Sequence, residues 1–170
     1  MTNMYCKGFT LIELLIGMSI LALILGLGLP SVSVWMQNTQ LRSAAESAQA
    51  GLQLARAEAV KRNTFIGFTM AGPDSGWSVD VMNPPQQLQS RSSVEGSGNA
   101  QIATTDATII FDGLGKTSLA ADATIQVTNP TGGLCKPAGD MNCLNVTVSV
   151  GGQVKMCDPT VVAAGDTRAC

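Results

Sequence analysis

The sequence is poor in several residue types on which enzyme chemistry often depends. It contains no histidine, which excludes histidine-based catalysis and histidine metal ligands. Of its 170 residues only 13% are charged and 4% are aromatic, and the formal net charge is -2. So small a net charge provides no general attraction to nucleic acids or to anionic membranes. The length favours a single domain.

The catalytic residue types that remain do not form a motif. A conventional catalytic triad is excluded because it needs a histidine. The segment Gly96-Ser97-Gly98-Asn99 lacks the strand-to-helix context of a phosphate-binding loop. We therefore expect a protein that is not an enzyme and that needs no cofactor.

The most prominent feature present is a long apolar run near the N-terminus. Leu11 to Leu29 would form about 28 Å of helix, just long enough to cross a bilayer core of about 30 Å. A plain membrane anchor and a secretory signal are two interpretations. However, the segment Gly28–Val34 lacks the small-x-small cleavage site of a secretory signal. In addition, Glu13 lies near the start of the run, where an acid costs free energy in a membrane.

The octapeptide at the start of this run, Lys7-Gly8-Phe9-Thr10-Leu11-Ile12-Glu13-Leu14, resembles the prepilin signal of type IV pilins and type II secretion pseudopilins. The resemblance implies cleavage by prepilin peptidase between Gly8 and Phe9, followed by N-methylation of Phe9. It also implies that Glu13 meets a neighbour's N-terminal ammonium in a filament and sets the register between subunits. Buried together, the two charges compensate one another, whereas either alone is costly.

Pro30 falls where major pilins commonly carry a helix-bending proline, and it predicts a kink because proline removes a backbone hydrogen bond. Beyond it, residues 31–62 predict an amphipathic helix. Its apolar positions recur mostly at three- and four-residue steps: Val32, Trp35, Met36, Leu41, Ala44, Ala45, Ala48, Leu52, Ala55, Ala59 and Val60. The stretch Leu52 to Asn63 resembles one typical of the FimT, FimU and GspH branch of minor pilins and pseudopilins.

After residue 63 the pattern predicts β-structure, in about six strands. The expected strands are Thr64–Met70, Trp77–Met82, Ala107–Asp112, Thr124–Thr128, Leu144–Val150 and Gln153–Cys157. Residues 84–100 are expected to form a long polar loop, either mobile or a contact surface. The resulting fold class is α+β, with a long N-terminal helix packed on an antiparallel sheet, as in pilins. The expected parts are a leader (1–8), a transmembrane or filament-core helix (9–30), an amphipathic helix (31–62) and a β-rich head (63–170).

Four cysteines remain after the expected cleavage, an even number that favours disulfides in an exported protein. Three pairings are possible. The first choice joins Cys135 to Cys143 and Cys157 to Cys170. A two-residue turn at Gly151-Gly152 would place Cys157 opposite Val146, near Cys143, so a cross-strand bond stays open. A zinc site is the other alternative, but no Cys-x-x-Cys spacing supports it, and we expect no metal.

The resemblance implies a minor type IV pilin that is held in the bacterial inner membrane before assembly and then joins a cell-surface pilus, at or near its tip. Its partners would be prepilin peptidase, other minor pilins and the major pilin. One alternative is a FimT-like receptor for DNA, with Lys155 and Arg168 as candidate contacts. Non-specific DNA binding needs several cations on one face, and residues 151–170 are electrically balanced. The other alternative is a GspH-like pseudopilin of type II secretion.

Overall fold

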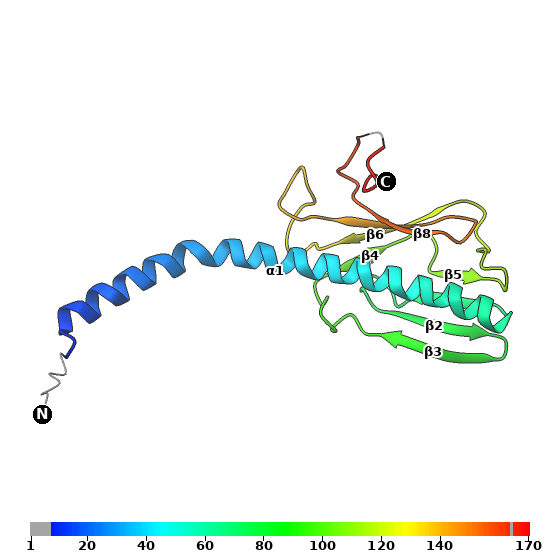
Figure 1. Cartoon of the computed structure of the whole chain (residues 1–170), viewed down its shortest axis with the longest axis horizontal. Helices are drawn as coiled ribbons and strands as arrows, with labels where there is room; N and C mark the ends of the chain where they lie inside the picture. Colours follow the sequence, from blue (N-terminus) through cyan, green and yellow to red (C-terminus); the bar gives the residue numbers. More distant parts are fainter. Residues whose placement is uncertain (1–7, 164) are drawn as a thin grey trace, which may run out of the picture. The chain divides into compact units, whose positions relative to one another are not determined.

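The computed structural model describes residues 8–163 and 165–170, with the side chains of residues 27–30 left out. One long helix, α1 (Leu11–Arg62), precedes all of the strands (Figure 1). Eight strands follow among the described residues: β1 (Ile66–Met70), β2 (Trp77–Met82), β3 (Pro85–Arg91), β4 (Gln101–Ala103), β5 (Thr108–Phe111), β6 (Ala123–Thr128), β7 (Leu144–Val148) and β8 (Val154–Cys157).

The end of α1 is fixed by its capping residues. Asn63 has a positive φ of 48°, a conformation that asparagine tolerates better than most residues. The backbone N–H groups of Asn63 and Thr64 donate to the carbonyls of Val60 and Ala59. This pair of bonds is a Schellman motif, which satisfies carbonyls that the helix end would otherwise leave unpaired. Lys61 and Arg62 in the last turn also favour this end electrostatically.

The strands form two antiparallel four-stranded sheets, with the orders β3-β2-β1-β5 and β4-β6-β7-β8. The predicted fold class, a long helix on antiparallel β-structure, is confirmed. The predicted number of strands is wrong, because β3 and β4 were missed. The polar loop expected at residues 84–100 contains β3, which pairs with β2. Its residues are mostly exposed on both faces of the strand, so they show no alternation that a pattern could detect.

One face of α1 packs on the sheets and forms much of the core. Its buried hydrophobic residues are Leu41, Ala44, Ala45, Ala48, Leu52, Ala55 and Ala59. Gly51 allows the closest approach, since a Cβ there would lie 2.6 Å from Cε2 of Phe68 and 3.1 Å from the ring of Trp77. The indole Nε1–H of Trp77 donates to Oγ of Ser47 at 2.8 Å, which satisfies a buried donor.

Four residues assigned to this apolar face by periodicity are exposed: Val32, Trp35, Met36 and Val60. Three of these residues are exposed because they lie at or before the start of the head. Contacts between residues divide the chain into Met1–Trp35 and Met36–Cys170. Val32 and Trp35 belong to the first unit, and Met36 is the first residue of the second. The helical pattern therefore continues beyond the part of α1 that the sheets cover.

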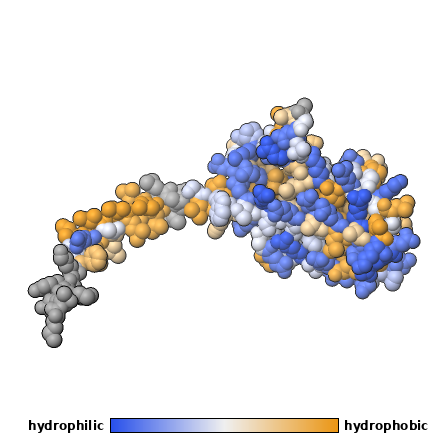
Figure 2. Space-filling model, viewed as in Figure 1, coloured by the Kyte–Doolittle hydropathy of each residue, from blue (hydrophilic) through white to orange (hydrophobic). Residues whose placement is uncertain are grey.

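The described part of the first unit leaves its apolar side chains exposed, and Figure 2 shows them as an almost continuous hydrophobic surface. Leu, Ile and Met side chains from Leu11 to Leu25 are each 52% to 77% exposed. Within the described residues, no single helix has the length and apolar character to cross a membrane, and Leu11–Gly26 with Ser31–Arg62 meet that test only together, as a bent pair. The kink expected at Pro30 falls among the side chains that are not described and stays a prediction.

Candidate functional site

The start of α1 is built by a reciprocal hydrogen-bonded pair. Oε2 of Glu13 accepts from the backbone N–H and from the hydroxyl of Thr10, both at 2.9 Å. The backbone N–H of Glu13 donates in turn to Oγ1 of Thr10 at 3.3 Å. This is a capping box, in which a Thr and a Glu three residues later satisfy donors at the helix N-terminus. The helix dipole also favours a negative charge at this end.

The capping role of Glu13 was missed in the sequence analysis, although its signal is present. Thr-x-x-Glu directly before an apolar run is the sequence form of a capping box. The cap does not exhaust the carboxylate, because each of its oxygens can accept more than one hydrogen bond. Glu13 can thus cap its own helix and still accept from an ammonium group brought by another chain.

Gly8 and Phe9, the residues at the expected cleavage site, are both exposed. Apart from its chain neighbours, no atom of the described residues lies within 4 Å of the position that a Cβ of Gly8 would take. The side chain of Phe9 is 91% exposed. Lys7 and the rest of the expected leader lie outside the described residues. Cleavage before Phe9 and N-methylation of Phe9 stay predictions. The exposure of Phe9 is compatible with both.

At the other end of the chain, the structure joins Cys135 to Cys143 and Cys157 to Cys170. The Cα atoms are 5.5 Å apart in the first pair and 5.1 Å apart in the second. With all four cysteines bonded to one another, the zinc alternative has no free thiolate. Across the described residues, no group of three or more His, Cys, Asp or Glu could hold a metal ion.

The predicted register of the last hairpin is wrong by one residue. Cys157 lies opposite Asn145, and Val146 lies opposite Met156. The connection is a three-residue turn, in which the N–H of Ser149 donates to the carbonyl of Gln153. Gly152 takes a positive φ of 81° in it, as three-residue turns require at this position. The extra residue shifts every pair along β8.

The C-terminal segment is tied back to β8 by polar contacts as well as by its disulfide. Nζ of Lys155 donates to the carbonyl of Ala169 at 2.7 Å, and the N–H of Asp158 donates to the carbonyl of Arg168. Arg168 also forms an ion pair with Asp166 at 2.8 Å. Hydrogen bonds from the side chain and backbone of Arg168 lower the pKa of Asp166 to about 2, and the same pairing raises the pKa of Arg168.

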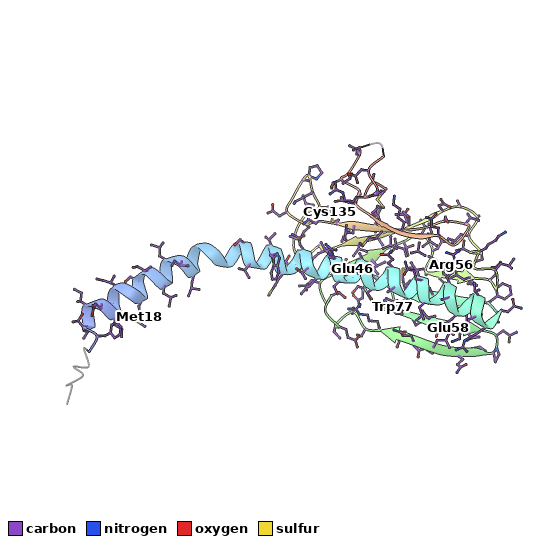
Figure 3. All side chains as sticks on the ribbon, viewed as in Figure 1. Met18, Glu46, Arg56, Glu58, Trp77 and Cys135 are labelled. Atoms are coloured by element: carbon purple, nitrogen blue, oxygen red, sulfur yellow. A yellow bond between two sulfur atoms is a disulfide. The ribbon has the colours of Figure 1, made fainter. Side chains whose placement is uncertain are left out.

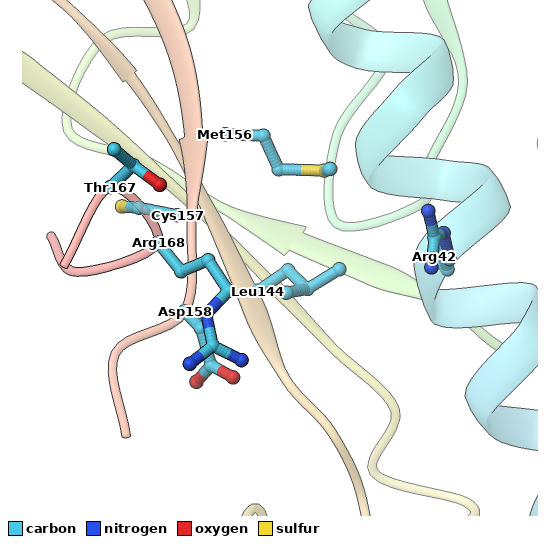
Figure 4. A pocket seen from close by; sticks show the side chains of 7 residues that line it. All are labelled: Arg42, Leu144, Met156, Cys157, Asp158, Thr167 and Arg168. Atoms are coloured by element: carbon cyan, nitrogen blue, oxygen red, sulfur yellow. The ribbon is translucent and has the colours of Figure 1, made fainter. Parts of the chain in front are cut away.

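A pocket of about 290 Å³ lies between this segment and α1 (Figure 4). Leu144 and Met156 form its apolar lining, with Arg42 on the helix side and Arg168 on the other. Arg42 is itself paired with Glu46 at 2.7 Å. Of the two candidate DNA contacts named from the sequence, Arg168 is neutralised by its ion pair with Asp166. Lys155 keeps its positive charge, because its hydrogen bond goes to a neutral carbonyl and uses one of its three N–H donors.

The loop closed by the first disulfide is held against α1 by one asparagine. Nδ2 of Asn38 donates to the carbonyl of Asp140 at 3.2 Å, and Oδ1 of Asn38 accepts from the N–H of Asn142 at 2.7 Å. Met141, between these two residues, is fully buried. The loop is therefore held at its covalent base and, through residues 140–142, against α1.

Comparisons with known proteins agree with these features. The model of the family described as Type II transport protein GspH matches residues 44–152, and that of the prokaryotic N-terminal methylation motif matches residues 3–29. The pilin-like protein PilA1 of Thermus thermophilus is 39% identical over 70 residues. That match covers 41% of the chain and 44% of PilA1, so the chain spans less than half the length of this relative.

Two kinds of solved structure share the fold. The type IV minor pilin FimU of Pseudomonas aeruginosa superposes with a TM-score of 0.61 at 18% identity, over 76% of the chain and 97% of FimU. The minor pseudopilin EpsH of the Vibrio cholerae type 2 secretion system superposes with a TM-score of 0.54 at 13% identity, over 72% of the chain and 99% of EpsH. At these identities the likeness concerns the fold.

Proposed function

Because the chain belongs to the GspH family of minor pilins and pseudopilins, which are structural proteins, we propose that it helps to start assembly of a type IV pilus and is incorporated at or near the pilus tip. Before assembly its N-terminal helix would reside in the bacterial inner membrane. After cleavage between Gly8 and Phe9 and N-methylation of Phe9, the helix would pack among the helices of other pilins.

The observation that carries this proposal is the contrast between an apolar helix segment, exposed among the residues that the structure describes, and a head closed by two disulfides. The apolar side chains from Leu11 to Leu25 are more than half exposed. So large an apolar surface is stable only in lipid or against other apolar helices. The head is self-sufficient, since its core is filled by its own helix and strands.

Glu13 supplies the specificity of the proposed packing. It is the one charged side chain between Phe9 and Leu29. Packed among other helices, its carboxylate would need a cation, and the free amino group of a neighbouring processed chain is a suitable one. In each processed chain the amino group would be on Phe9, next to the Thr10–Glu13 capping box. A pair between Glu13 of one chain and the amino group of another would therefore fix the axial position of the two subunits.

Between the alternatives, a pilus is favoured over type II secretion by the two-disulfide C-terminal region, whereas the N-terminal features are shared by both. A DNA receptor is less well supported, because Arg168 is neutralised by Asp166, which leaves Lys155 as the one candidate contact without a carboxylate partner among the described residues. Neutralising phosphates requires several available cations on one face. We therefore propose a role in filament assembly as the primary function.

The test is a deletion strain examined together with labelled wild-type filaments. Without the protein, we expect few surface filaments, and complementation should restore them. Antibodies against the head should label filament ends, and sheared filaments should contain the processed chain. A normal filament number in the deletion strain, with the protein found in the envelope fraction and absent from filaments, would contradict the proposal.

A further inference from the structure

We propose that the groove beside Arg56, on the C-terminal half of α1, binds a carboxylate side chain of a neighbouring filament subunit. The groove has a volume of about 630 Å³ and lies between α1 and the β7–β8 hairpin. It is lined by Gln53, Arg56, Ala57, Val60, Lys61, Gln153 and Val154. This inference rests on the proposed function, because it names a contact that filament assembly would use.

The guanidinium of Arg56 is held in place by the backbone. Its Nε–H donates to the carbonyl of Gly115 at 3.1 Å. Gly115 is in turn approached so closely by Gly152 that a Cβ on Gly152 would collide with the Gly115 carbonyl oxygen. Both glycines have positive φ, so two tight turns converge on this arginine. Arg56 is thereby oriented before any partner arrives, which lowers the entropy cost of binding.

Arg56 has no carboxylate partner within the described part of the chain. The nearest acid in sequence is Glu58, but residues two apart on a helix lie on different faces. Figure 3 shows Arg56 and Glu58 on opposite sides of α1. Glu58 instead pairs with Lys61 at 3.2 Å and with Arg62 at 2.6 Å, and this pairing lowers its pKa.

The remaining donors of Arg56 match a single carboxylate. A guanidinium has five N–H donors, and the bond to Gly115 uses Nε. The two terminal nitrogens are left to form a bidentate pair with an aspartate or glutamate. The stem of such a side chain would lie against Val60 and Val154, which line the same groove. Val60, 51% exposed, would then be covered.

The groove suits a protein carboxylate better than a nucleic acid. It carries two cations and no carboxylate in its lining, and Lys61 is already paired with Glu58. One available guanidinium can pair with one acid, whereas non-specific binding to a phosphate backbone requires several cations. The two residues that line the groove from the hairpin, Gln153 and Val154, are both neutral.

The first experiment compares charge reversals in the full chain in cells. Arg56→Glu should lower the ratio of protein in sheared filaments to protein in the envelope by about tenfold, equivalent to ~1.4 kcal/mol of association. Arg56→Lys should retain part of the incorporation, since it keeps the charge. Lys136→Glu, at an exposed cation outside the groove, should behave as wild type.

The second experiment identifies what occupies the groove without altering Arg56. A photo-crosslinking amino acid at Gln53 should give an adduct with another subunit of the sheared filaments. No adduct, or an adduct with nucleic acid, would overturn the proposal, as would incorporation of Arg56→Glu to the same level as Lys136→Glu. Absence of the wild-type chain from filaments would instead remove the pilus-assembly function, and the groove proposal with it.

Discussion

The two halves of α1 have the same backbone structure but opposite relationships with their surroundings. From Leu11 to Leu25 the large apolar side chains are at least half exposed, and the helix is started by the Thr10–Glu13 capping box. From Leu41 to Ala59 the apolar side chains of one face are buried against the sheets. Burying one leucine or isoleucine contributes about 1.5–3 kcal/mol. The exposed apolar side chains of the first half can therefore contribute such stabilisation only when another molecule buries them.

The two halves show that the size of the side chains on the helix depends on what packs against them. In the head, small residues such as Ala44, Ala48 and Gly51 let the sheets approach the helix closely. In the first half, large apolar residues surround the helix, as expected for packing against lipid or neighbouring helices on all sides. The same helix is thus a core element in one half and an assembly element in the other.

Removing the charge of Glu13 is expected to have the largest effect. Glu13→Ala should allow membrane insertion and cleavage but nearly abolish recovery in sheared filaments, because a neighbour's amino group would lose its partner. The measurement is an immunoblot of processed protein in the envelope and filament fractions.

Glu13→Gln separates the two roles of this residue. Glutamine can replace glutamate in a capping box, so the helix start would be kept while the charge is removed. If registration depends on the charge, the Glu13→Gln variant should fail to enter filaments, as the Glu13→Ala variant does. Wild-type incorporation of Glu13→Gln would show that capping alone matters, and wild-type incorporation of Glu13→Ala would refute both roles.

Matched leucine truncations test the comparison directly. Leu52→Ala removes a fully buried side chain and should lower the free energy of unfolding of the head by about 2–5 kcal/mol. Leu21→Ala, at a position 57% exposed, should leave that free energy unchanged. Denaturant unfolding of the full chain in detergent, followed by near-ultraviolet circular dichroism of the buried Trp77, measures both. Equal effects of the two substitutions would mean that the halves do not differ as described.

Sequence patterns predicted those features that depend on local chemistry. The long helix, the strands with alternating burial such as β2, and the family all follow from local residue patterns. β3 was missed because an exposed edge strand has no buried face to produce alternation. The hairpin register was wrong because a three-residue turn with Gly152 at positive φ is indistinguishable in sequence from a two-residue Gly-Gly turn.

The groove beside Arg56 is a different case, since it joins residues more than fifty positions apart. The contact of Arg56 with Gly115 and the approach of Gly152 to the same carbonyl depend on how sheet and helix pack. No local pattern indicates such a contact. The capping role of Glu13, by contrast, was readable from Thr10 and Glu13 alone, and was overlooked because the family resemblance already explained the acid.

The smallest expected effect concerns the pair of Asp166 with Arg168, which lies within the C-terminal segment and, like the Thr10–Glu13 pair, is a local contact made by a carboxylate. The pKa of Asp166 is lowered to about 2 from an ordinary value of 3.8 by hydrogen bonds from Arg168. Its contribution to stability is therefore fully present above about pH 4 and is lost as the pH falls through 2. Nuclear magnetic resonance titration should give an Asp166 pKa near 2, and Arg168→Gln should return it toward 3.8. A wild-type pKa near 3.8 would mean that this pair does not form in solution, with the segment still tied to β8 by Cys157–Cys170 and the backbone contacts.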